Sequence, residues 1–210
     1  MNSEADIIFC AKPSAEQLEK AKQMGKAFKL TPIGKEAFVF FVNSHNPVTN
    51  LTVQTIQSIY AGNIKNWKAI SGADREIIAY QRPQNSGSQT ILEHIMGNIP
   101  IMEPPQENMI ASMGGMFRQV AAYRNYDNAI GYSFLFFSKE MADSSGIKLL
   151  DINNVSPAKE NIINGKYPYI VDFYAVTLGD ETENTNKLIE WILSKQGQYL
   201  IEKTGYVPIN

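Results

Sequence analysis

The run at residues 37–43 (AFVFFVN) constrains the fold of this chain more than any other feature, because it is almost wholly apolar and aromatic. A strand with one wet face alternates polar and apolar residues, whereas a run of this kind is typical of a central strand buried on both faces. A second long apolar and aromatic strand is predicted at residues 169–176 (YIVDFYAV). Helical patterns separate the predicted strands. This order indicates an α/β fold with mixed, mostly parallel sheets flanked by helices.

Capping signals place the helices. Ser14 and Gln17 have the spacing of a capping box, and Gly25 follows where that helix would end. Thr52 is expected to cap a second helix, which Gly62 would end. Further strands are expected at residues 5–10, 77–80, 129–137 and 147–152, and the first of these is expected to be buried.

The composition suits a globular chain without a nucleic-acid partner. With 210 residues, 44% of them hydrophobic, the chain could form one large domain or two lobes. Its formal net charge of −2 does not favour nucleic acid or an anionic membrane.

Cys10 is the single cysteine, so we expect no internal disulfide and a small core residue at this position. Neither an apolar run of about 20 residues nor a signal-peptide pattern is present, which predicts an intracellular chain or one whose leader is not part of this sequence.

One segment, IIAYQRPQNSGSQTILEHIM, combines a short strand, a polar turn and a helix. Ser86 stands three residues before Gln89, the spacing of an N-cap and its capping-box partner, so the helix start is expected to present free backbone N–H groups. Such groups attract anions. The hydroxyls of Ser86 and Ser88 and the guanidinium of Arg82 are expected to add further donors, and Gly87 would let a ligand approach the backbone. An ordinary capped helix beside a surface arginine would have the same sequence, and the segment alone favours neither interpretation.

The pair Gly114-Gly115 is a second place where a ligand could approach the backbone at a helix start. The pair interrupts a helical pattern, so on spacing alone a turn between two helices is the favoured interpretation. Gly115 is therefore a minor candidate ligand.

No motif for catalysis, a cofactor or a metal stands out. The histidines, His45 and His94, lie far apart without metal-ligand spacing around them. The glycine motifs of nucleotide-binding loops and of hydrolase nucleophiles are missing from the sequence. We therefore expect no enzyme activity, no cofactor and no metal.

A series of motifs runs in order from residue 5 to residue 209: ADIIF with Pro13, Asn46-Pro47, LTVQTIQSIYAGNIKNW, Arg82 with Ser-Gly-Ser, AIGY, GKYP and QGQYLIEKTGYVP. In this combination the chain resembles the phosphate-binding proteins of ABC-type phosphate uptake, which have the two-lobed type II periplasmic-binding fold. The resemblance implies an incomplete first lobe from residues 1–43 and 169–210. It implies a second lobe from residues 44–168, with the ligand cleft between the two.

The family's arginine and its Ser-Gly-Thr/Ser turn hold phosphate. By resemblance, this implies Arg82, Ser86, Gly87 and Ser88 as the phosphate ligands of this chain. The chain would then be a solute-binding domain for a tetrahedral oxyanion, phosphate first, with an ABC permease as partner and a periplasmic or cell-surface location. The alternative is a sensory or interaction module with the same fold that binds a different small ligand or none.

Two departures from the family concern the first lobe. The family has an opening strand and helix ahead of the segment that begins here at residue 5, so we expect an unpaired sheet edge and self-association through this lobe. Cys10 and Ala11 stand where the family commonly has serine and tends to have aspartate, which makes them minor candidate ligands. With alanine in place of that carboxylate, we expect weak phosphate binding and poor separation of phosphate from sulfate.

Overall fold

Strand β2 (Lys29–Asn43) contains the apolar run that dominates the sequence. The computed structural model describes residues 5–141 and 145–209 of the chain. Every side chain from residue 37 to residue 43 is buried. Phe41 packs face to face on Phe117 with ring centroids 4.3 Å apart, and Phe38 and Phe40 lie edge to face at 5.5 Å. The prediction of a strand buried on both faces is confirmed.

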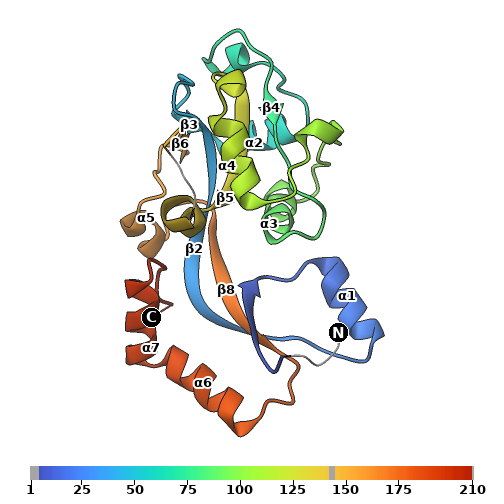
Figure 1. Cartoon of the computed structure of the whole chain (residues 1–210), viewed down its shortest axis with the longest axis vertical. Coiled ribbons are helices and arrows are strands. Elements are labelled where there is room, and N and C mark those ends of the chain that lie inside the picture. The colour runs from blue at the N-terminus through green and yellow to red at the C-terminus, as the bar shows by residue number, and fades with distance from the viewer. Residues whose placement is uncertain (1–4, 142–144, 210) are drawn as a thin grey trace. The chain divides into compact units, whose positions relative to one another are not determined.

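The chain forms two compact units, one from Met1–Glu36 with Val171–Asn210 and one from Ala37–Ile170. Strand β2 carries the chain from the first unit into the second, and β8 (Ile170–Thr177) returns it, as the chain can be followed in Figure 1. Both ends of the sequence therefore contribute to the first unit. The assignment of ligand-closing lobes to residues 1–43 with 169–210 and to residues 44–168 stays a prediction.

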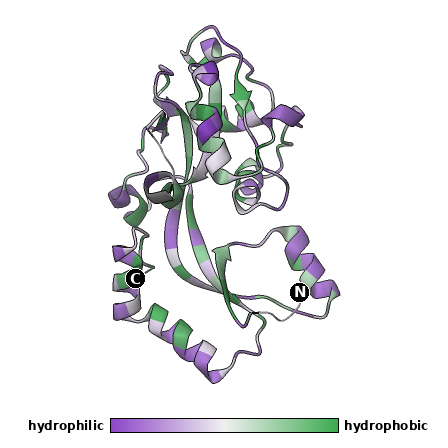
Figure 2. Ribbon diagram, viewed as in Figure 1, coloured by the Kyte–Doolittle hydropathy of each residue, from purple (hydrophilic) through white to green (hydrophobic). Residues whose placement is uncertain are grey.

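The first unit combines strands with amphipathic helices. Its elements are β1 (Ile8–Ala11), α1 (Ala15–Gln23), α6 (Glu183–Leu193) and α7 (Lys195–Lys203), with the adjoining ends of β2 and β8. The strand order is β1-β8-β2, and β1 runs antiparallel to β8. Hydrophobic and hydrophilic residues alternate along α6 and α7 (Figure 2). The buried side chains of this unit's core cluster are Ile33, Ala175, Ile189 and Ile192.

Strand β1 is more exposed than the sequence predicted. Ile8 is 49% exposed and Phe9 is 53% exposed. Because neighbouring residues of a strand point to opposite faces, neither face of β1 is fully covered. Strand β1 also ends the order of the described sheet, so its outer edge faces no paired strand there. The prediction of a buried strand is wrong at this position, because an edge strand and a central strand can carry the same apolar residues.

The second unit holds the elements around the predicted anion segment. Its strands are β3 (Asn50–Leu51), β4 (Ile78–Ala79), β5 (Ala129–Phe134), β6 (Ile147–Leu149) and β7 (Asp151–Ile152). Its α-helices are α2 (Val53–Tyr60), α3 (Gly87–Met96), α4 (Met113–Ala121) and α5 (Lys159–Ile163). Short 3₁₀ elements are η1 (Trp67–Ile70), η2 (Gln106–Asn108) and η3 (Tyr123–Asn125), and η4 (Phe137–Met141) is a π-helical turn. None of the helices in the described parts of the chain is both long and apolar enough to cross a membrane.

The sheets are mixed, without the parallel majority that the sequence predicted. Among the strand pairs with a described register, β1–β8, β2–β5 and β2–β6 are antiparallel, and β3–β7 and β4–β5 are parallel. The α/β class is confirmed, but the expectation of mostly parallel sheets is wrong. That expectation rested on the strand-helix-strand order of β1, α1 and β2, yet β8 lies between β1 and β2 in the sheet. Strand β1 therefore pairs with β8, and this pairing is antiparallel.

The helix ends follow the capping signals. Ser14 and Gln17 form a complete capping box at the start of α1, and Thr52 accepts a hydrogen bond from the first turn of α2. Gly25 and Gly62 follow the two helices with φ angles of 69° and 76°. Such angles are readily adopted only by glycine. These local predictions are confirmed.

We expect Phe41→Ala to destabilise the second unit by about 3 to 5 kcal/mol, because the substitution leaves a cavity beneath Phe117. Tyr123→Ala removes an aromatic ring that is 89% exposed in the same unit, and should change stability by less than about 1 kcal/mol. Urea unfolding can be followed through the fluorescence of the buried Trp67 in a Trp191→Phe background. Equal losses for the two substitutions would contradict the assignment of the core.

Candidate functional site

The anion segment folds as a strand, a polar loop and a capped helix, as predicted. Strand β4 leads through the loop to Ser86, whose Oγ accepts a hydrogen bond from the backbone N–H of Gln89 at 3.3 Å. Asn85 precedes the cap with a φ angle of 64°, a conformation that asparagine tolerates. The first amides of a helix have no acceptor inside it. The N–H groups of Gly87 and Ser88 therefore begin α3 without intrahelical partners.

The three residues of the Ser-Gly-Ser turn differ in exposure. Ser86 is half-buried, Gly87 is exposed and Ser88 is buried. The hydroxyl of Ser86 accepts the capping bond through its oxygen, so its hydrogen stays available for donation. An anion that approaches this turn therefore meets the backbone of Gly87 first, beside a hydroxyl donor.

Arg82, four residues before the cap of α3, supplies a half-buried positive charge. Its Nη1 donates a hydrogen bond to the carbonyl oxygen of Ile110 at 2.9 Å. Its Nε is buried and has no hydrogen-bond partner within the described residues. Burial lowers the pKa of Arg82 from its ordinary value, but a guanidinium keeps its charge at neutral pH. A buried donor on a cation costs free energy unless it finds an acceptor, so this position favours an anionic ligand.

Gln89 does not complete the capping box that its spacing predicted. Its side-chain Oε1 accepts hydrogen bonds from the backbone N–H of Arg82 and from the hydroxyl of Tyr132. Its Nε2 donates to the Oε1 of Gln81 at 3.4 Å. The capping-box prediction is therefore correct for Ser86 and wrong for Gln89. The side chain of Gln89 instead accepts a hydrogen bond from the backbone of Arg82.

Sequence reasoning missed Tyr132 and Gln81 as neighbours of the site. Tyr132 lies on β5, and strand β4, which ends shortly before Arg82, pairs parallel with β5. The pairing that joins these distant segments has no local sequence signal. The AIGY motif belongs to the family pattern, but the motif alone does not place its tyrosine beside Arg82.

The glycines at the start of α4 do not form a turn between helices. Gly114 and Gly115 lie in the first turn of α4, which Ser112 caps by accepting a hydrogen bond from the N–H of Gly115 at 3.0 Å. A Cβ at Gly115 would lie 3.0 Å from Cγ2 of Ile110, the residue whose carbonyl holds Arg82. The favoured turn interpretation is wrong. The amide of Gly115 is already used by the cap, and its role as a minor ligand stays a prediction.

The remaining candidates lie away from this segment in the chain. Cys10 and Ala11 belong to β1 in the first unit, and their roles as minor ligands stay predictions. Cys10 is only half-buried, and burial raises the pKa of its thiol, which keeps the thiol protonated at neutral pH. His45 stacks on Tyr126 with ring centroids 3.9 Å apart, and His94 lies in the last turn of α3. Within residues 5–141 and 145–209, no three His, Cys, Asp or Glu side chains gather as a metal site would require.

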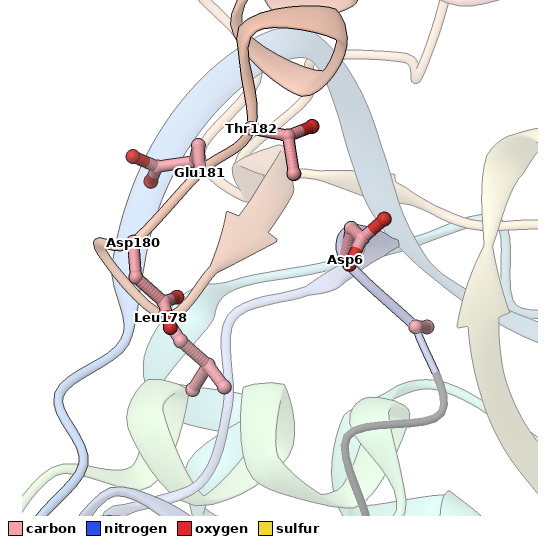
Figure 3. Close-up of a pocket in the computed structure, with 6 residues that line it drawn as sticks. Asp6, Leu178, Asp180, Glu181 and Thr182 are labelled. Atoms are coloured by element: carbon pink, nitrogen blue, oxygen red, sulfur yellow. The ribbon is translucent and has the colours of Figure 1, made fainter.

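A cavity of about 100 Å³ in the first unit has the wrong charge for an anion. Figure 3 shows the side chains that line it, which include Asp6, Asp180 and Glu181. Glu181 accepts a hydrogen bond from Thr177 and pairs with Lys29 at 3.4 Å, and these contacts lower the pKa of its carboxyl group. Carboxylates repel an oxyanion, so this cavity is not a second phosphate site.

The family model for the PBP superfamily domain matches residues 1–196. The chain belongs to this family. The match includes all of the second unit and the first unit up to residue 196, and the α/β fold class of the type II periplasmic-binding proteins is confirmed.

Two curated relatives of this PBP superfamily domain are named as phosphate-binding proteins. The phosphate-binding protein PstS of Borreliella burgdorferi is 25% identical over 201 residues, which cover 93% of this chain and 71% of the relative. The protein of the same name from Bacillus subtilis is 26% identical over 170 residues, which cover 80% of this chain and 53% of that relative. The chain thus spans about half of the second relative's length.

Solved structures agree with the fold over almost the whole PBP superfamily domain. A candidate phosphate ABC transporter substrate-binding protein from Clostridium perfringens, solved with bound phosphate, has a TM-score of 0.76 and 26% identity. The match covers 98% of this chain and 80% of that chain. An ABC-type phosphate transport receptor from Vibrio cholerae has a TM-score of 0.73 and 24% identity, and 97% and 80% of the two chains are covered. The recognised resemblance to phosphate-binding proteins is confirmed.

We expect Ser86→Ala to lower the free energy of unfolding by about 1 kcal/mol, because the first turn of α3 loses its side-chain acceptor. Ser58→Ala, which changes a serine inside α2, should be neutral or slightly stabilising, because alanine favours a helix interior. Urea unfolding of both variants measures the difference. If the two substitutions have the same effect, the hydroxyl of Ser86 does not cap α3 in solution.

Proposed function

We propose that this chain is a non-catalytic solute-binding domain for a tetrahedral oxyanion, inorganic phosphate first, in ABC-type phosphate uptake. The observation that carries the proposal is the half-buried guanidinium of Arg82, whose buried Nε has no hydrogen-bond partner among the described residues. The backbone N–H of the same residue is hydrogen-bonded to the side chain of Gln89 in the first turn of α3. The relatives named as phosphate-binding proteins support the same ligand. An ABC permease as partner and a location outside the cytoplasm are parts of this proposal.

The proposed ligands contribute either positive charge or directed hydrogen bonds. Arg82 supplies the positive charge, and its planar donors suit the oxygen atoms of a phosphate group. The amides of Gly87 and Ser88 supply directed donors, and the partial positive charge of the helix start adds to them. The hydroxyls of Ser86 and Ser88 complete the set. None of these groups provides a nucleophile with an adjacent base, which is why we propose binding without turnover.

Arg82→Ala should weaken phosphate binding by about 2 to 4 kcal/mol, because it removes a charge-assisted contact that involves two parallel donors. The matched control is Arg75→Ala, since Arg75 is 65% exposed and its Nε pairs with Asp127 at 3.3 Å. Titration calorimetry with phosphate, sulfate and a neutral sugar compares both variants with the parent.

Unchanged phosphate affinity in Arg82→Ala would place the anion site elsewhere. A parent chain that binds the sugar, or none of the three solutes, would instead favour the sensory or interaction module. Release of phosphate from a phosphate ester would contradict the non-catalytic proposal.

Self-association through β1 is a further part of the proposal. Strand β1 ends the described strand order, and a second copy could pair with its outer edge in antiparallel orientation. If Phe9 lies opposite Phe9 of the second copy, Asp6 lies opposite Lys12, and the apolar Ile8 lies opposite Cys10. The segment from Asp6 to Lys12 is therefore complementary to itself in charge and in hydrophobicity.

Phe9→Lys should shift the chain toward the monomer. In the proposed pairing, the lysine at position 9 would lie opposite the same lysine of the second copy, and the two positive charges would repel each other. Met24→Lys is the matched control, since Met24 is 46% exposed in the same unit but lies outside β1. Sedimentation equilibrium over a range of concentrations measures both variants. A parent chain that stays monomeric throughout would contradict the pairing.

A further inference from the structure

The backbone N–H of Arg82 is held by two buried side chains that come from different elements. It donates to the hydroxyl oxygen of Tyr132 at 2.8 Å and to Oε1 of Gln89 at 3.2 Å. Tyr132 is 1% exposed and Gln89 is 6% exposed. The hydroxyl of Tyr132 in turn donates to Oε1 of Gln89. The three groups therefore form a closed triangle of hydrogen bonds inside the second unit.

Each group in the triangle has its role set by a further contact. Burial raises the pKa of Tyr132 well above its ordinary value, so its hydroxyl keeps the proton that it donates. The side-chain amide of Gln89 is oriented by its Nε2, which donates to Oε1 of Gln81. Gln81 is oriented by its own Nε2, which donates to the carbonyl oxygen of Met102 at 2.8 Å. With these partners, Gln89 Oε1 faces Arg82 and Tyr132 as an acceptor.

Helix α1 shows what Gln89 would do without this network. Gln17 stands three residues after the cap Ser14, and its Oε1 accepts the backbone N–H of Ser14 at 2.9 Å. Gln89 has the same spacing from Ser86, but its side chain turns to Arg82. Ser86 donates its own N–H to the carbonyl oxygen of Pro83 instead, at 3.1 Å. The chain therefore gives up one local capping bond and gains a link between α3 and the arginine.

The link connects the two halves of the proposed anion site. Gln89 belongs to the first turn of α3, whose backbone amides are the proposed hydrogen-bond donors to the anion. Its side chain accepts a hydrogen bond from the backbone N–H of Arg82, the proposed charged ligand. At the other end of the arginine, the carbonyl oxygen of Ile110 accepts from Nη1. Arg82 is thus restrained at its backbone and at its guanidinium. Restraint before binding reduces the entropy that a ligand must remove.

We propose that Tyr132 and Gln89 are positioning residues for oxyanion binding, which act by fixing Arg82 against the start of α3. This inference rests on the proposed function, because it assumes that Arg82 is a ligand. It assigns a binding role to two side chains that need not touch the anion.

A double-mutant cycle tests the proposal. Tyr132→Phe keeps the ring but removes the hydroxyl, and should weaken phosphate binding roughly tenfold. Gln89→Met, a second variant that keeps the helix propensity, should weaken it to a similar extent. In an Arg82→Ala background, neither substitution should weaken phosphate binding further, because each acts through Arg82. The fall in the urea midpoint caused by Tyr132→Phe should be the same in both backgrounds.

The matched control is Tyr167→Phe. Tyr167 is 1% exposed in the same unit, and its hydroxyl donates to the carbonyl oxygen of Phe38 at 3.2 Å. This substitution removes a buried hydroxyl without touching Arg82, so phosphate affinity should stay at the parent value. Inorganic phosphate titrations followed by the amide shifts of Gly87 and Ser88 in NMR spectra measure weak affinities in every variant.

The outcomes separate this inference from the proposed function. If Arg82→Ala binds phosphate like the parent, the proposed function fails. If Arg82→Ala loses phosphate binding but Tyr132→Phe retains the parent affinity, only the positioning role is overturned. Equal losses from Tyr132→Phe with and without Arg82 would also overturn it, because a residue that acts through the arginine cannot affect binding in its absence.

Discussion

Burial of the apolar part of β2 on both faces is the constraint on which the second unit depends. Phe38 and Phe40 lie in an aromatic cluster with Tyr60 and Tyr132, and the ring of Tyr132 is 5.4 Å from that of Phe38 and 5.7 Å from that of Tyr60. The apolar packing sets the place of the tyrosine ring, and the hydroxyl at its tip then reaches the backbone of Arg82. The hydrophobic core and the polar site thus share one side chain.

The same burial gives the polar contacts their strength. A hydrogen bond gains in energy where water is excluded, and an unpartnered polar group becomes costly there for the same reason. Gln81, Gln89 and Tyr132 are all nearly inaccessible, and each uses its side-chain groups on specific partners. Among the described residues, the Nε of Arg82 is a buried donor on a positively charged group that has no hydrogen-bond partner. A cationic donor that lacks a partner, on a residue whose backbone N–H and Nη1 are already hydrogen-bonded, is suited to an anion that supplies the acceptor.

Much of the fold follows from short sequence patterns, because the interactions behind them are local. A cap involves atoms three residues apart, as at Ser14, Thr52 and Ser86, and a glycine after a helix is favoured by its own backbone angles. The apolar run in β2 determined its own burial, since no other environment accommodates so many adjacent apolar side chains. The candidate ligands, Arg82 and the Ser-Gly-Ser turn, were found for the same reason, as they lie within seven residues of one another.

The sequence by itself therefore determined the helix ends, the central strand and the segment that carries the positive charge. Tertiary structure decided which strands pair, and so it placed β8 between β1 and β2 and left β1 exposed. It also decided that Gln89 serves Arg82 rather than Ser86, because Tyr132, fifty residues away from Arg82 in the chain, supplies the competing hydrogen bond. Contacts between distant segments depend on how the whole core packs, and they cannot be predicted from the spacing of residues along the chain.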